Sequence, residues 1–226
     1  MEKLLDTYLL NARLYFSEAE LLAYGRFFDE VIIERYLNNL EKSNFPRFIK
    51  IRTIPEFEEE LPVPYSEIWQ IHHEFINSLT QCDDKDARDL IHFFFSERLF
   101  SEFLIVLGQR ITPASIQTSE ALPPEDAILL EQAFKPYNSE IKIAVRAWEK
   151  HVGRNENDFW GKIDGSPHQK EEHVRELVNS IMAKHSWWNV FGHFKHGTVY
   201  EIRSESGHGL RWSIDQNKFI GFVEPF

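Results

Sequence analysis

Hydrophobic residues recur with a helical period along most of the first 152 residues. From residue 28 to residue 40 they recur with the spacing of one helical face, at Phe28, Val31, Ile32, Tyr36 and Leu40. Residues 86–110 are apolar on most of their circumference, a pattern typical of a central helix surrounded by others. We expect this central helix to be either continuous or broken near Ser96.

Capping signals mark where two of the predicted helices begin. Ser17 is followed three positions later by Glu20, a capping-box spacing. Ser166 precedes Pro167, with Gln169 at the third helical position, and this predicts a helix over 167–185. Residues 45–65 contain four prolines, Pro46, Pro55, Pro62 and Pro64, and predict an extended surface connection.

The pattern changes after His185, where apolar and polar residues alternate with a period of two. Three such runs, 198–204, 210–214 and 219–223, are separated by short segments rich in Gly, Ser, Asp and Asn. This pattern predicts a three-stranded antiparallel β-meander.

Together these elements predict an α+β fold, mainly a bundle of six to seven helices with the meander at its C-terminal end. Residues 1–152 form the helical body in this prediction. Residues 153–226 add a helix and the sheet, and we expect them to pack into the same globule.

The composition of the chain is that of a folded globular protein, with 42% hydrophobic and 14% aromatic residues among 226. No run of about 18 uncharged apolar residues predicts a membrane span. The first residues include Glu2 and Asp6, where a signal peptide requires a basic region. The single cysteine, Cys82, excludes an intramolecular disulfide. We therefore expect a cytoplasmic protein that does not bind membranes.

The net charge of −11 is unevenly distributed. Residues 1–150 carry −10 and residues 151–226 carry −1. Duplex nucleic acid is bound largely through its phosphates, so an acidic body argues against extensive nucleic-acid wrapping. It favours a protein partner, in particular a basic one, although charge that only maintains solubility is the simpler interpretation.

Residues 151–226 contain 7 of the 10 histidines, and three of these are the candidate catalytic residues. His193, His196 and His208, with Glu201 between them in sequence, have the chemistry of acid/base groups or of ligands for a divalent metal. The alternative is that they are ordinary surface or hydrogen-bonded histidines. We predict no cofactor, and leave a divalent metal as the alternative.

Four further residues are candidate ligand contacts. Strand alternation places Glu201, Arg203 and Arg211 on one sheet face, where two arginines would hold a phosphate or carboxylate. The alternative is a Glu–Arg pair on a solvated face. Trp188 belongs to an aromatic run that would stack on a base or sugar, or would simply pack in the core.

No motif in the sequence specifies a reaction, so whether the protein is an enzyme stays open. The acidic surface favours a non-enzymatic binding or inhibitory protein of the cytoplasm. The alternative function is an enzyme that acts on a phosphate-containing substrate, a nucleotide or nucleic acid, through the C-terminal His/Arg patch. A nucleotide or nucleic-acid partner belongs to that alternative. The oligomeric state is left open by the sequence.

Overall fold

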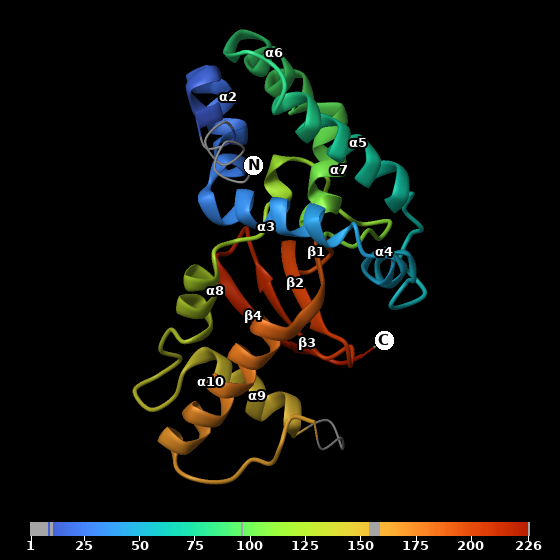
Figure 1. Ribbon diagram of the computed structural model, residues 1–226. Helices are drawn as coiled ribbons and strands as arrows, with labels where there is room; N and C mark the ends of the chain where they lie inside the picture. The colour runs from blue at the N-terminus through green and yellow to red at the C-terminus, as the bar shows by residue number, and fades with distance from the viewer. Residues whose placement is uncertain (1–8, 10, 96, 154–158, 226) are drawn as a thin grey trace. The chain divides into compact units, whose positions relative to one another are not determined.

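The computed structural model describes residues 9, 11–95, 97–153 and 159–225. The chain divides into two compact units, a helical unit at Met1–Leu122 and a sheet unit at Pro123–Phe226 (Figure 1). In the helical unit, the elements among the described residues are η1 (Asn11–Tyr15), α2 (Glu18–Tyr24), η2 (Gly25–Phe28), α3 (Glu30–Lys42), α4 (Pro46–Thr53), α5 (Tyr65–Leu79), α6 (Asp84–Phe94), α7 (Glu97–Leu107) and η3 (Ser119–Ala121).

Aromatic side chains form the core of the helical unit. Phe27 meets Phe100 edge-on with their ring centroids 4.0 Å apart, and Phe75 stacks on Phe94 at 3.6 Å. Such geometries add to the free energy gained from burying the rings. Tyr36 and His72, from α3 and α5, bring a polar contact into this core, with Tyr36 Oη 3.0 Å from His72 Nδ1.

In the part of the sheet unit that the structure describes, three helices precede four strands. The helices are α8 (Asp126–Ala133), α9 (Ile143–Val152) and α10 (Pro167–Lys184), and the strands are β1 (His185–His193), β2 (Gly197–Ser204), β3 (Gly209–Ser213) and β4 (Lys218–Val223). The strands pair antiparallel in the order β1-β2-β3-β4. From the sequence, helices α8 and α9 are expected in the helical body, but both follow Pro123, where the sheet unit begins.

The helices pack against one face of the sheet. Tyr200, Trp212 and Phe222, which come from β2, β3 and β4, lie on this face and are buried. Trp212 donates its indole N–H to the carbonyl oxygen of Leu129 in α8, and α9 contacts β4. The other face of the sheet carries the polar side chains of the candidate site.

The predicted α+β class is confirmed, with one strand more than predicted. Residues 185–193 form β1, whose bulge between His185 and Trp187 interrupts the alternation at its start. The predicted capping boxes at Ser17 and Ser166 are both present.

Two further predictions need correction or completion. Residues 46–53 form helix α4 and not an extended loop, because Pro46 occupies the first helical turn, where a missing N–H costs nothing. The predicted central helix consists of two helices, α6 and α7; Ser96 itself lies outside the described residues.

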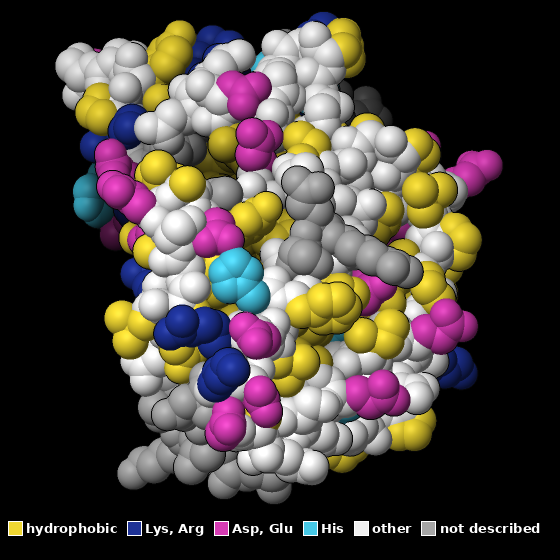
Figure 2. Space-filling view, turned by 90° about the horizontal axis from the view of Figure 1, so that it is seen from above, with side chains coloured by type: hydrophobic (Ala, Val, Ile, Leu, Met, Phe, Trp, Pro, Cys, Tyr) yellow, Lys and Arg dark blue, Asp and Glu magenta, His cyan; other side chains and the backbone are white. Residues whose placement is uncertain are grey.

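Charge is distributed unequally between the two units. The helical unit contains 12 Lys and Arg against 21 Asp and Glu, and the sheet unit contains 13 against 15. Figure 2 shows acidic, basic and apolar side chains intermixed over one face of the molecule. None of the described helices is both long and apolar enough to span a bilayer.

Candidate functional site

The turn between β1 and β2 is held in place by β3 and by the turn that follows β3. The hydroxyl group of Ser213 donates to the carbonyl oxygen of His196, at 2.9 Å. The carboxylate of Asp215 accepts the backbone N–H of Thr198, at 2.7 Å. Gly197 has a φ of +66°, a left-handed conformation that glycine adopts without strain. The turn therefore presents its side chains from a fixed backbone.

Two imidazoles lie together on this turn. The ring centroids of His193 and His196 are 4.8 Å apart. The backbone N–H of Lys195 donates to Nδ1 of His193 at 3.1 Å, so neutral His193 carries its proton on Nε2. Burial lowers the pKa of His193, and the positive charge of Arg211 lowers it further. His193 is thus a hydrogen-bond donor at neutral pH.

His196 is the second imidazole of the turn. Burial lowers its pKa, and the nearby charges of Lys218, Arg211 and Lys195 lower it further. The ring is therefore neutral near pH 7, and a neutral imidazole has one nitrogen able to accept a proton. This is the protonation state that a general base requires.

Glu201 in β2 joins the two arginines that the sequence singled out. Its carboxylate accepts the Nε–H of Arg203 at 2.6 Å and also that of Arg211. Arg203 further donates from Nη1 to the carbonyl oxygens of Gly207 and Glu224, each at 2.7 Å. Arg203 thus ties the β2–β3 turn to the C-terminal segment, and the Arg203 and Glu201 side chains are buried although the sequence left their face open to solvent.

Arg211 in β3 differs from Arg203 in how its guanidinium group is used. Its side chain is 20% exposed and lies over the ring of Phe191, with the guanidinium carbon 5.7 Å from the ring centroid. Among the described residues, its Nη groups have no hydrogen-bond partner. They are the part of a guanidinium fork that binds phosphate oxygens.

We call the resulting group the basic turn cluster. It comprises His193, Phe194, Lys195, His196, Arg211 and Lys218. Phe194 is 89% exposed, and the ammonium nitrogen of Lys195 lies 5.1 Å from its ring centroid. Two carboxylates position the cluster. Glu201 accepts from Arg211, and Asp215 accepts from the backbone N–H of Thr198. The cluster combines cations for phosphate, an aromatic ring for base stacking and imidazoles for proton transfer.

His208 lies at the opposite end of β2 from the basic turn cluster. It directly precedes Gly209, which pairs with Arg203, whereas His193 pairs with Gly197. Its Nε2 is 3.5 Å from the carboxylate of Glu224. Burial lowers the pKa of His208, and Glu224 opposes that shift. The structure does not bring His208 together with His193 and His196.

The predicted metal ligands are therefore separated in space. Within the described part of the chain, no three His, Cys, Asp or Glu side chains converge as a metal site requires. The carboxylate of Glu224 instead lies 2.8 Å from His151 Nε2 and accepts the indole N–H of Trp160 at 2.7 Å.

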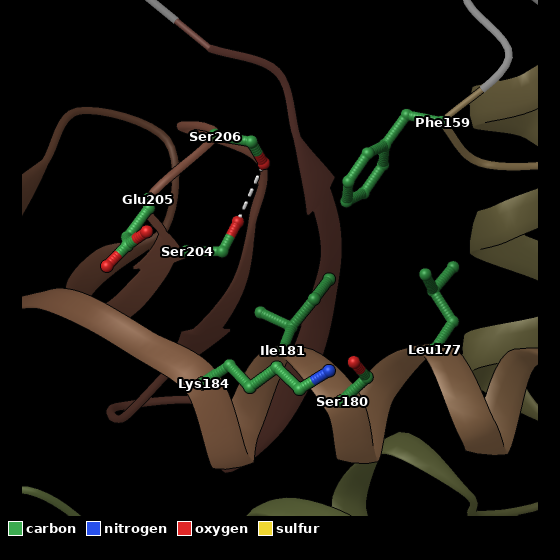
Figure 3. Close-up of a pocket in the computed structure, with 8 residues that line it drawn as sticks. All are labelled: Phe159, Leu177, Ser180, Ile181, Lys184, Ser204, Glu205 and Ser206. Carbon is green, nitrogen blue, oxygen red and sulfur yellow. Dashed lines mark hydrogen bonds between the residues drawn. The ribbon is translucent and has the colours of Figure 1, made fainter.

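A pocket of about 460 Å³ opens beside His208. Figure 3 shows Phe159 directed into it, opposite the β2–β3 turn. Helix α10 forms its floor. The lining residues are Phe159, Leu177, Ser180, Ile181, Lys184, Ser204, Glu205 and Ser206.

Of the predicted site residues, His193 lies beside His196, and Arg211 is bonded to Glu201. Arg203 is bonded to Glu201 as well, but its Nη1 donates to two backbone carbonyl oxygens. Trp188 is buried on the helix-facing side, with its ring 6.2 Å from that of Tyr200, as in the core-packing alternative. Sequence reasoning missed Phe194, Lys195 and Lys218. The only sequence signal for Phe194 was an aromatic residue between two histidines in a predicted turn.

The comparison with protein families concerns the sheet unit. Residues 130–224 match the model of the CdiA C-terminal tRNase toxin domain family. No curated protein matches.

One solved structure is similar to part of the chain. It is the toxic C-terminal tip of CdiA from Pseudomonas aeruginosa, crystallised in complex with its immune protein. It shares 28% sequence identity with the chain, covers 42% of it and 99% of its own length, and superposes with a TM-score of 0.36.

The family match corrects the function predicted from the sequence. A non-enzymatic binding or inhibitory protein was expected from the acidic surface, and that prediction is wrong, because residues 130–224 match a tRNase toxin domain. The net negative charge was a poor guide to function because most of it lies in the helical unit, outside the matched residues. A protein partner and a cytoplasmic location stay predictions.

Proposed function

We propose that the sheet unit is a ribonuclease domain that cleaves tRNA, with the basic turn cluster as its active site. The observation that carries this proposal is the match of residues 130–224 to the tRNase toxin domain family. The cluster lies within those residues. It supplies the cationic, aromatic and proton-transfer groups that cleavage of an RNA strand needs.

The proposed reaction uses the ribose 2′-hydroxyl group as the nucleophile. Neutral His196 takes the proton of this hydroxyl, and the 2′-oxygen attacks the adjacent phosphorus. The bond from phosphorus to the 5′-oxygen breaks, and this oxygen takes a proton from a water molecule. The hydroxide that remains takes the proton held by His196, which returns the imidazole to its neutral form. The products are a 2′,3′-cyclic phosphate and a 5′-hydroxyl. DNA lacks the 2′-hydroxyl group and is not cleaved by this route.

Two other residues act on the phosphate in this reaction. The Nη groups of Arg211 bind its non-bridging oxygens, where negative charge increases in the transition state. His193 donates from Nε2 to the same phosphate, since its Nδ1 is occupied by the backbone of Lys195. Phe194 stacks on a neighbouring base.

The local charge of the cluster suits this role although the whole chain is acidic. The sheet unit is close to neutral, at −2, and three of its cations, Lys195, Arg211 and Lys218, surround one turn. A small basic cluster contacts a few phosphates and does not require a basic protein.

The test uses the whole chain with purified tRNA and with single-stranded DNA of equal length. We expect cleavage of tRNA alone. Arg211→Gln should reduce kcat/KM by about 10²-fold or more, the effect of removing one transition-state donor. The matched control is Arg146→Gln, which removes an arginine whose nearest carboxylate, on Glu149, is 4.0 Å away.

Two results would overturn the proposal. One is intact tRNA after prolonged incubation with folded protein. The other is cleavage that Arg211→Gln and Arg146→Gln affect equally, since it would place the reaction elsewhere.

A further inference from the structure

The pocket beside His208 is separate from the basic turn cluster. Ser204 and Gly197 are at opposite ends of β2, which corresponds to about 20 Å along a strand. None of the residues that line the pocket belongs to the cluster. The pocket is therefore a second candidate site.

One helical face forms the floor of the pocket. Ser180 and Ile181 follow Leu177 by three and four residues in α10, and Lys184 follows them by four and three, so all four lie on one side of the helix. Leu177 and Ile181 are apolar. Lys184 adds an ammonium group at the end of the row, and the residues of this floor are labelled in Figure 3.

Phe159 forms an aromatic wall. One face of its ring lies on His208, with centroids 3.6 Å apart and planes inclined by only 4°. The side chain nevertheless remains 40% exposed and lines the pocket. Trp160 meets Phe159 edge-on at 4.8 Å. The ring is thus held as a rigid platform on which another planar ring can stack.

The rim opposite Phe159 is polar. The hydroxyl oxygens of Ser204 and Ser206 are 2.9 Å apart (Figure 3). The hydroxyl oxygen of Ser206 is also 2.9 Å from Nδ1 of His208. These hydroxyls provide hydrogen-bonding groups within a turn whose backbone Arg203 holds through the carbonyl of Gly207.

We propose that this pocket binds one nucleotide, with its base on the Phe159 ring and its phosphate at Lys184. The volume of about 460 Å³ lies in the range of small-ligand sites, about 300–1,000 Å³. The flat ring of Phe159, the apolar side chains of Leu177 and Ile181, the serine hydroxyl groups and the ammonium group of Lys184 match the parts of a nucleotide. The inference rests on the proposed function in one respect: the nucleotide is a unit of the RNA substrate, several nucleotides away from the cleaved bond.

The test is isothermal titration of the whole chain with adenosine 5′-monophosphate, with adenosine and with inorganic phosphate. We expect the monophosphate to bind more tightly than either part. Phe159→Ala should weaken its binding about 5- to 100-fold, the range for loss of one base–aromatic stack. Phe159→Trp should restore binding. Lys184→Gln should remove the advantage of the monophosphate over adenosine.

Two matched variants control for non-specific effects. Tyr137→Ala removes another exposed aromatic ring of the sheet unit, and Lys162→Gln removes another exposed lysine. Both should bind as the wild type does. Thermal melting of each variant shows whether it is folded.

No binding of the monophosphate at millimolar concentration would overturn the inference, as would binding that neither Phe159→Ala nor Lys184→Gln weakens. The same preparations are assayed on tRNA. Cleavage of tRNA without nucleotide binding would refute the proposed role of the pocket and leave the proposed function unaffected. Nucleotide binding without cleavage would refute the proposed function.

Discussion

His72 shows how one buried residue links the stability of the helical unit to pH. Its Nδ1 contacts the hydroxyl group of Tyr36, and its side chain is fully buried. Burial lowers its pKa to about 3. The folded state thus keeps the imidazole neutral, whereas in the unfolded chain it titrates near its ordinary value of about 6.5.

The sign of the pH dependence follows from this difference. The unfolded state binds a proton below pH 6.5 and the folded state does not, so stability falls as the pH decreases from about 6.5 towards 3. Between pH 7 and pH 5 we expect a loss of about 2 kcal/mol from this residue. Urea unfolding at the two pH values measures it.

The variant His72→Gln should remove this part of the pH dependence. His168→Gln, whose side chain is 81% exposed, should leave it unchanged. Equal pH dependence in the wild type and in His72→Gln would show that the imidazole is not held neutral by burial.

At the scale of an element, the sheet depends on one close approach between β2 and β3. A Cβ atom at Gly209 would meet the carbonyl oxygen of Ile202 at 2.1 Å, too close for any real contact. At Gly192 in β1 a Cβ atom would meet nothing within 4 Å. The two glycines are therefore not equivalent.

We predict that Gly209→Ala destabilises the sheet unit by about 1–3 kcal/mol, because the neighbouring strand must move. Gly192→Ala should change its stability by less than about 0.5 kcal/mol. Chemical denaturation of both variants compares them directly. A Gly209→Ala variant as stable as Gly192→Ala would contradict the β2–β3 register.

Most elements could be predicted from the sequence because their signals are local. The serine at 166 and the glutamine at 169 bond to each other's backbone in α10, as their spacing predicted. Helix α4 was missed because proline was read only as a helix breaker. Strand β1 was missed because Trp187 and Trp188, adjacent and both buried, do not show the alternation of a half-exposed strand.

The site could be predicted only in part, because strand register decides which side chains meet. Alternation correctly placed Glu201 and Arg211 on one face, and the structure pairs them across β2 and β3. The sequence could not show that His208 lies at the other end of β2 from His193. Nor could it show that Arg203 uses its donors on backbone carbonyls.

For the whole molecule, the boundary between the two units determines which fragment can fold. The sheet unit begins at Pro123, and α8 and α9 complete its core. Trp148 of α9 is buried and donates its indole N–H to the carbonyl oxygen of Trp160, at 2.8 Å. The boundary expected from the sequence, after residue 152, leaves this helix out.

We predict that a fragment of residues 123–226 unfolds cooperatively, whereas a fragment of residues 153–226 does not. The shorter fragment keeps α10 but exposes the part of the sheet that α8 and α9 cover, including Trp212 and Phe222. Circular dichroism during thermal unfolding distinguishes the two. Cooperative unfolding of the shorter fragment would mean that α8 and α9 are dispensable.

The most direct measurement of the proposed function compares how fast the whole wild-type chain and its His196→Ala variant cleave tRNA at pH 7. His168→Ala serves as the control, since it removes an exposed histidine of α10. Loss of a general base lowers the rate by about 10²- to 10⁴-fold, and we predict a decrease of that size for His196→Ala alone. Equal rates for His196→Ala and the wild type would contradict the assignment of the basic turn cluster as the active site.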